Sequence, residues 1–172
     1  MGNYLITGRS GTGKSTIHKE LVSRGYASHD GDSVPQLAGW TDLSIGQRIE
    51  SDYPGHDHFG KFDWDWDKLV LKELLSQPGE TFLCGNADNA INFYGLFDKV
   101  FILTLPEAEQ RRRIMARSEH DYGKDAAVQN EVIRAQTILV ETAMTLGAMV
   151  VDAQPSAQII VDYILEKISH DG

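Results

Sequence analysis

Short runs of apolar residues alternate along this chain with longer stretches in which apolar residues recur every three or four positions. Nearly continuous apolar character over four or five residues is typical of parallel strands covered on both faces. The runs that fit this description are 4–7, 25–29, 81–84, 99–103 and 148–151. We therefore predict five buried strands in one parallel sheet.

The longer stretches predict helices, because their apolar residues fall on one face at a period of 3.6 residues. The predicted helices cover 14–24, 66–74, 128–146 and 160–168. Gly147 stands where helices commonly end, and Pro155 stands near the start of the last helix. Strands alternating with helices predict an α/β fold with helices on both faces of the sheet. The stretch 33–67 shows little periodicity, and we expect it to be irregular.

Composition narrows the class of protein. The chain has 172 residues, enough for one domain over 1–172, and its formal net charge of −9 argues against nucleic acid as a partner. A single cysteine excludes an internal disulfide. No apolar run approaches the ~20 residues of a membrane span, and the first residues lack the basic flank of a signal peptide. We expect a cytoplasmic protein with no membrane partner.

One motif predicts the chemistry. Residues 8–15, Gly-Arg-Ser-Gly-Thr-Gly-Lys-Ser, match G-x-x-x-x-G-K-[ST] between a predicted strand and a predicted helix. Such a loop turns its amides inward to bind phosphates, and the alternative is a flexible glycine-rich turn. Lys14 would reach the β and γ phosphates of ATP, and Ser15 would ligate Mg²⁺. The predicted ATP-binding residues here are Gly8, Arg9, Ser10, Gly11, Thr12, Gly13, Lys14, Ser15 and Thr16.

A second signal, Asp30-Gly31-Asp32, directly follows the second predicted strand. The carboxyl ends of parallel strands share one edge of the sheet, so these carboxylates should lie near the phosphate loop. One could hold Mg²⁺ while the other accepts a hydroxyl proton. The alternative is an ordinary acidic turn.

Arginines at 111, 112, 113 and 117 precede a polar segment. Arg113 and Arg117 would share a helix face at a spacing of four, whereas Arg111 and Arg112 would be mostly at the surface. We predict a mobile lid over 117–125, with Gly123 as its hinge, that brings Arg113 and Arg117 to the ATP phosphates. The alternative is a solvated basic helix end.

The region expected to bind the acceptor, the molecule that would receive the phosphoryl group, is acidic. Residues 30–67 hold nine acidic and two basic residues, and Arg48 is the one arginine among them. Anionic acceptors are usually clamped by arginines, so this balance favours a neutral or cationic hydroxyl compound. Arg48 is a candidate contact to it.

Three further readings in the acceptor region and the strands stay open. The aromatic residues of the acceptor region could stack on a ring or simply pack, and they are Trp40, Tyr53, Phe59, Trp64 and Trp66. The sequence His56-Asp57-His58 invites a metal reading but shows no third ligand. Cys84 could be a nucleophile, although a free cysteine at a strand end is usually a small buried apolar residue.

Together these features resemble the nucleoside-monophosphate-kinase-like P-loop kinases, notably shikimate kinase, gluconate kinase and adenylate kinase. The resemblance implies a three-layer fold with strand order 2-3-1-4-5 and a lid between the fourth strand and the long helix. It also implies that adenine contacts the loop after the fifth strand, 152–155, where Gln154 is the candidate residue. Lys124 or Arg117 would replace the Arg-Pro pair of shikimate kinase lids, which this chain lacks.

The likeness to Asp-x-Asp in shikimate kinase implies that Asp32 is the acceptor-side base and Asp30 the Mg²⁺ ligand. Gly85 and Asn86 occupy the place of an acceptor-binding loop, within an acceptor region of about 33–79. The third strand ends in Cys84 instead of the aspartate of a Walker B motif, so Asp30 would have to support the metal.

The sequence thus predicts an ATP-dependent kinase that phosphorylates a hydroxyl of a small molecule, with Lys14, Asp32 and Arg117 as catalytic residues. The alternatives are a nucleoside monophosphate kinase, a nucleotide-dependent ATPase or switch protein, and a polynucleotide 5′-hydroxyl kinase. The sequence leaves the oligomeric state open.

Overall fold

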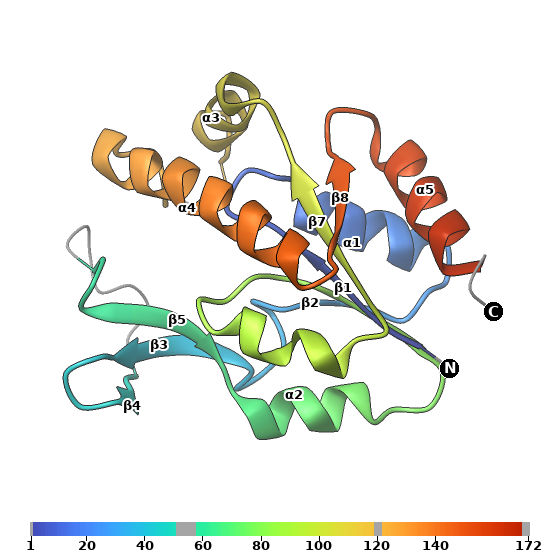
Figure 1. Ribbon diagram of the computed structural model, residues 1–172, viewed down its shortest axis with the longest axis horizontal. Helices are drawn as coiled ribbons and strands as arrows, with labels where there is room; N and C mark the ends of the chain where they lie inside the picture. Colours follow the sequence, from blue (N-terminus) through green and yellow to red (C-terminus); the bar gives the residue numbers. More distant parts are fainter. Residues whose placement is uncertain (1, 51–57, 119–121, 170–172) are drawn as a thin grey trace.

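A five-stranded parallel sheet forms the centre of the computed structural model, which describes residues 2–50, 58–118 and 122–169 (Figure 1). The strands are β1 (Gly2–Thr7), β2 (Ser28–Asp30), β6 (Glu80–Cys84), β7 (Lys99–Thr104) and β8 (Met149–Asp152). Their order is β2-β6-β1-β7-β8, which is 2-3-1-4-5 when these five strands are numbered along the chain. The predicted fold and strand order are confirmed.

Two hydrophobic cores lie on the two faces of this sheet, because successive strand residues point to opposite sides. Ile6 packs against α1 (Lys14–Ser23) and α5 (Ala157–Ser169). Leu5, its neighbour, packs against α2 (Lys68–Leu75), α4 (Ala126–Thr145) and the 3-10 helix η1 (Ala90–Leu96). The helix α3 (Glu107–Met115) follows β7. This arrangement gives the three layers that the sequence predicts.

Local signals set the helix ends. The Asp125 carboxylate accepts hydrogen bonds from the first-turn amides of α4, and Asp67 does the same for α2. At the end of α4, Gly147 has a φ of 84°, and Ala148 N–H donates to the Ala143 carbonyl in a Schellman motif. None of the described helices combines the length and apolar character needed to cross a bilayer.

The expectation of an irregular stretch over 33–67 is wrong. Part of it forms a second, antiparallel sheet of β3 (Ala38–Asp42), β4 (Gln47–Arg48) and β5 (Phe62–Trp66), in the order β4-β3-β5. This sheet extends from the central sheet near β2 (Figure 1). Trp66 ends β5 and does not begin the following helix as predicted.

Arg48 holds the second sheet together. Its guanidinium donates to the carbonyl oxygens of Gln36, Leu37 and Asp65 at 2.7, 3.1 and 2.7 Å. It also covers Gly39, where a Cβ would stand 2.9 Å from Arg48 Nε. The Arg48 guanidinium therefore donates to backbone carbonyls in and beside the second sheet.

The loops after β2 and β6 meet in close backbone contact. Gly31 N–H donates to the Cys84 carbonyl at 2.9 Å, and a Cβ on Gly85 would stand 3.2 Å from the Gly31 Cα. The same Cβ would stand 3.0 Å from Cζ2 of Trp66, which is 2% exposed. Glycine at both positions lets the two loops lie side by side at the carboxyl edge.

We expect Gly85→Ala to lower the free energy of unfolding by about 1–3 kcal/mol, because its methyl group overpacks this contact. Gly95→Ala is the matched control, since a Cβ there meets nothing within 4 Å. The control should change stability by less than about 1 kcal/mol. Urea unfolding of both variants checks this, and equal stabilities of the two would contradict the close contact.

Candidate active site

The phosphate loop has the backbone shape that its glycines permit. Gly8, Gly11 and Gly13 have φ values of 148°, 89° and 101°, which residues with a Cβ rarely adopt. A Cβ on Gly8 would also stand 2.7 Å from the Thr12 hydroxyl, and one on Gly11 would stand 2.8 Å from Ile114 Cγ1. Both the required backbone angles and the close neighbours demand glycine.

Side chains from distant helices hold this loop from outside. Gln136 on α4 accepts the Arg9 amide at 2.6 Å and donates to the Leu103 carbonyl at 2.9 Å. Gln110 on α3 donates to the Ser10 carbonyl at 2.7 Å. Both glutamines are buried, and sequence reasoning missed them because an amide inside an amphipathic helix carries no recognisable motif.

Lys14, the first residue of α1, is placed at the loop with its Nζ 3.4 Å from the Arg9 carbonyl oxygen. Burial lowers the pKa of Lys14 to about 8, helped by the charges of Arg117 and Arg9 and opposed by those of Asp32 and Asp30. The charges of Asp32 and Asp30 do not offset the effect of burial on the Lys14 pKa. An anion bound in the loop would favour the protonated amine.

Both predicted lid arginines reach the loop. Arg117 Nη1 donates to Ser10 Oγ at 2.8 Å, and Arg113 Nη1 lies 3.6 Å from the place of a Cβ on Gly13. Arg117 lies beyond the end of α3 at Met115, so the shared helix face predicted for the two arginines is wrong. Arg113 reaches the loop from the last turn of α3, and Arg117 reaches it from the segment after the helix.

Glu109 on α3 orients the neighbouring arginines. Arg112 Nε and Arg113 Nε each lie 2.7 Å from its carboxylate, and these hydrogen bonds lower the pKa of Glu109 to about 2. Arg111 instead bonds Glu107 and residues of α4, in accord with its predicted surface role. Arg112 is exposed, as predicted, and its side chain also borders the central cavity.

The two predicted carboxylates lie on one tight turn after β2. Asp32 N–H donates to Asp30 Oδ1 at 3.1 Å, and the indole Nε1 of Trp64 donates to Asp32 Oδ1 at 3.1 Å. Asp30 and the Ser15 hydroxyl both line the cavity and offer the hard oxygen ligands that Mg²⁺ prefers. The residues present therefore fit the predicted metal site.

A cavity of about 1040 Å³ joins these groups. Because β2 and β8 are the two edge strands, the loops that follow them lie at opposite ends of the carboxyl edge, with the phosphate loop of β1 between them. At one end the cavity is lined by residues from β2, β3, β5 and the loop after β6. At the other end it is lined by α3, α4 and the segment after β8.

Most of the predicted site residues line this cavity. They are Arg9, Ser10, Gly11, Thr12, Gly13, Lys14, Ser15, Thr16, Asp30, Asp32, Asn86, Arg113 and Arg117. The structure does not bring Gly8, Arg48, Gly85 or Gln154 to its lining, and Gln154 instead donates to the Asp152 carboxylate. After β8 the lining residues are Ala153, Pro155, Ser156, Ala157 and Ile160.

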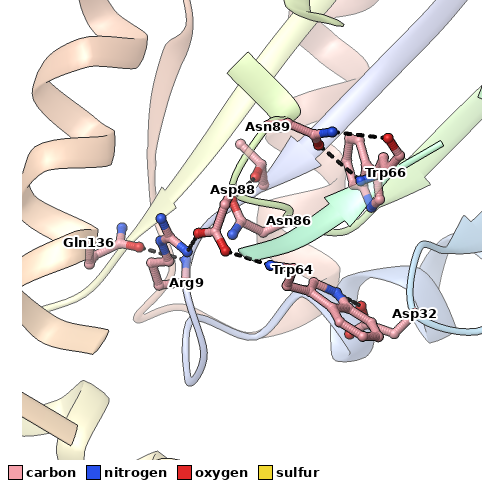
Figure 2. A network of polar contacts seen from close by, with 9 residues as sticks. Arg9, Asp32, Trp64, Trp66, Asn86, Asp88, Asn89 and Gln136 are labelled. Carbon is pink, nitrogen blue, oxygen red and sulfur yellow. Dashed lines mark hydrogen bonds and ion pairs between the residues drawn. The ribbon is translucent and has the colours of Figure 1, made fainter. Parts of the chain in front are cut away.

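Sequence reasoning also missed Asp88, which lies between the phosphate loop and the second sheet (Figure 2). Its carboxylate binds Arg9 Nη1 at 2.7 Å and accepts the Trp64 amide at 2.8 Å. Nearby, Asn89 bonds both the amide and the carbonyl of Trp66. The available signal was the polar cluster Asn86–Asn89 directly after a buried strand.

Aromatic rings wall the end of the cavity next to the second sheet. Trp40 and Trp64 face each other across β3 and β5, with ring centroids 5.1 Å apart, and the buried His58 lies 5.1 Å from Trp40. Of the other predicted aromatic residues, Phe59 lines the cavity, Trp66 is buried beneath it, and Tyr53 lies outside the described residues.

A metal site at His56-Asp57-His58 and a nucleophilic Cys84 gain no support. Among the described residues no group of three His, Cys, Asp or Glu side chains could hold a metal ion, and His56 and Asp57 lie outside them. Burial raises the pKa of Cys84 to about 12, so its thiol stays protonated at neutral pH. Residues 119–121 of the predicted lid also lie outside the described part of the chain.

A glycine-rich phosphate loop at the centre of a 2-3-1-4-5 parallel sheet defines an α/β P-loop protein. Residues 5–138 match the AAA domain family, and this chain belongs to that family. A comparison with curated protein sequences finds no match.

Solved structures of small-molecule kinases share the fold. A shikimate kinase from Acinetobacter baumannii, in complex with shikimate, matches with a TM-score of 0.65 and 17% identity over 99% of this chain and 94% of its own. Deoxyadenosine kinase from M. mycoides with bound dATP matches with a TM-score of 0.58 and 15% identity over 98% of this chain and 100% of its own. A gluconokinase from Sinorhizobium meliloti 1021 matches with a TM-score of 0.54 and 16% identity over 98% of this chain and 92% of its own. The predicted resemblance to this group of P-loop kinases is confirmed at the level of the fold.

The lowered pKa of Lys14 predicts a proton linkage to nucleotide binding. At about pH 9 Lys14 should be mostly neutral in the free protein, because its pKa is about 8, and a bound triphosphate should restore its proton. We therefore expect MgATP binding to take up a proton at about pH 9 and to weaken as the pH rises above 8. Calorimetry in buffers of different ionisation enthalpy measures the uptake. Lys14→Ala should show none, and buffer-independent heat in the unaltered protein would contradict the prediction.

Proposed function

We propose that this protein is an ATP-dependent kinase that transfers the γ-phosphoryl group of MgATP to a hydroxyl of a small neutral or cationic acceptor. The observation that carries the proposal is the meeting of Lys14, Arg117 and Asp32 in one cavity with the phosphate loop. An anion-binding loop alone fits any nucleotide-binding protein. A carboxylate lining the same cavity adds a group that can accept a hydroxyl proton.

Each residue has a distinct task in this transfer. The acceptor oxygen forms a bond to the γ-phosphorus, the bond from that phosphorus to the bridging oxygen of ADP breaks, and Asp32 takes the hydroxyl proton. Lys14 and Arg117 bind the phosphate oxygens and neutralise the charge that develops there. Mg²⁺ held by Ser15 and Asp30 would supply further charge neutralisation.

The charges of the cavity support the choice of acceptor. Among the described residues, no lysine or arginine of β2, β3, β5 or the loop after β6 lines the cavity, and Arg9 of the adjoining phosphate loop is already paired with Asp88. Asp30, Asp32 and Asp63 line the same end. Burial and the charges of Asp88 and Asp65 raise the pKa of Asp63. This environment disfavours a further phosphate or carboxylate and thus a nucleoside monophosphate.

We expect Lys14→Ala to lower kcat for phosphoryl transfer at least about a hundredfold, because the variant loses charge stabilisation in the transition state. Lys19→Ala is the matched control on the same helix, since Lys19 is exposed and outside the cavity lining. Release of ADP and formation of phosphorylated acceptor measure both. Unchanged turnover in Lys14→Ala with an intact fold would overturn the proposed kinase activity.

Acceptors that differ only in charge should be phosphorylated at clearly different rates. Neutral sugars and nucleosides and their amino derivatives should be phosphorylated, whereas the matching monophosphates should react at least about tenfold more slowly, because repulsion by the aspartates weakens their binding. Initial rates with radiolabelled ATP compare each pair. Faster reaction of the monophosphates would favour a nucleoside monophosphate kinase instead.

A further inference from the structure

A continuous chain of polar contacts runs from the phosphate loop to the candidate base. Arg9 of the loop binds Asp88 at 2.7 Å. Asp88 exchanges two hydrogen bonds with the backbone of Trp64, at 2.8 Å through its carboxylate and at 2.7 Å through its own amide. The Trp64 indole then donates to Asp32 at 3.1 Å (Figure 2).

This series of contacts restricts the orientation of the Asp32 carboxylate. Asp32 is exposed and lies on a turn, and the hydrogen bond to its carboxylate comes from Trp64, in another segment. The indole of Trp64 is rigid, and its strand is fixed twice to Asp88 and also paired with β3. A donor held in this way selects one orientation of the Asp32 carboxylate relative to the phosphate loop.

The contact also leaves the carboxylate able to react. The indole Nε1 donates to Oδ1, and a carboxylate has two oxygens with several acceptor positions. A tryptophan has no acidic or basic function near neutral pH and therefore orients the carboxylate without competing for the proton.

We propose that Trp64 is a positioning residue that holds Asp32 for proton acceptance, and that Asp88 ties this unit to the phosphate loop through Arg9. The proposal rests on the kinase function argued above. It assigns Trp64 a role through its N–H group, which differs from stacking of its ring on the acceptor.

Trp64→Phe tests the role, because it removes the N–H group and keeps an aromatic ring and both backbone bonds to Asp88. We expect kcat to fall about tenfold, the value of one hydrogen bond to a charged group, while KM for acceptor and ATP stays within about twofold. A rise in KM with unchanged kcat would instead show a stacking role and overturn the proposal.

Trp66→Phe is the matched control. It makes the same chemical change two residues along β5, but Trp66 is buried, lies outside the cavity lining, and its Nε1 has no hydrogen-bond partner among the described residues. We expect lower stability with kcat within about twofold of the unaltered protein. A fall in kcat equal to that of Trp64→Phe would mean that general loosening of β5 causes both effects, which would overturn the proposal.

A double-mutant cycle identifies the residue through which Trp64 acts. Asp32→Asn should lower kcat by itself, and adding Trp64→Phe in that background should lower it less than about twofold further, because the oriented group is already lost. A full additional tenfold loss would overturn the proposal. If Trp64→Phe does not fold, benzothienylalanine at position 64 replaces only the N–H group by sulfur and gives the same test.

The assay separates the two proposals. Absence of phosphoryl transfer by the unaltered protein with every acceptor class would overturn the kinase function and, with it, this role of Trp64. Transfer by the unaltered protein, together with unchanged kcat in Trp64→Phe, would overturn the role of Trp64 alone.

Discussion

A phosphate loop binds an anion only while enough of its amides point inward, and in this loop the Thr12 amide already pairs with the Arg9 carbonyl at 3.3 Å. The loop cannot provide that geometry by itself, since peptide groups seek internal partners or water. Here Gln136 accepts the amide of Arg9 and Gln110 donates to the carbonyl of Ser10, each from a different helix. The packing of α3 and α4 beside the sheet therefore keeps the loop open, and the rest of the site depends on it.

The sequence was informative where the signal is local. Glycine spacing identified the phosphate loop, because only certain residues adopt its backbone angles, and continuous apolar runs identified the five parallel strands. The run Phe62-Asp63-Trp64-Asp65-Trp66 also carried a signal, a strict alternation of aromatic and acidic residues. The presence of turn residues around it masked that period, so the second sheet went unpredicted.

The missing parts of the site depend on tertiary contacts. The charge of Arg48 made it a candidate contact to an acceptor. Its guanidinium instead donates to three backbone carbonyls in and beside the second sheet. Gln110, Gln136 and Asp88 have no pattern in the sequence that marks them, because each acts on a segment far away along the chain. Polar residues of this kind are identified only after the fold places their partners.

The order of the strands divides the molecule into two regions with separate demands. Most of the walls at the end next to the second sheet come from the segment between β2 and β6 and from the loops of these two strands, joined by Tyr122 beside His58, whereas α3, α4 and the segment after β8 form the opposite end. The segment between β2 and β6 can therefore be exchanged without touching the half that faces those helices. A scaffold of this design can acquire new selectivity through that one segment, provided that the replacement keeps a strand amide for Asp88, which follows β6 and pairs with Arg9.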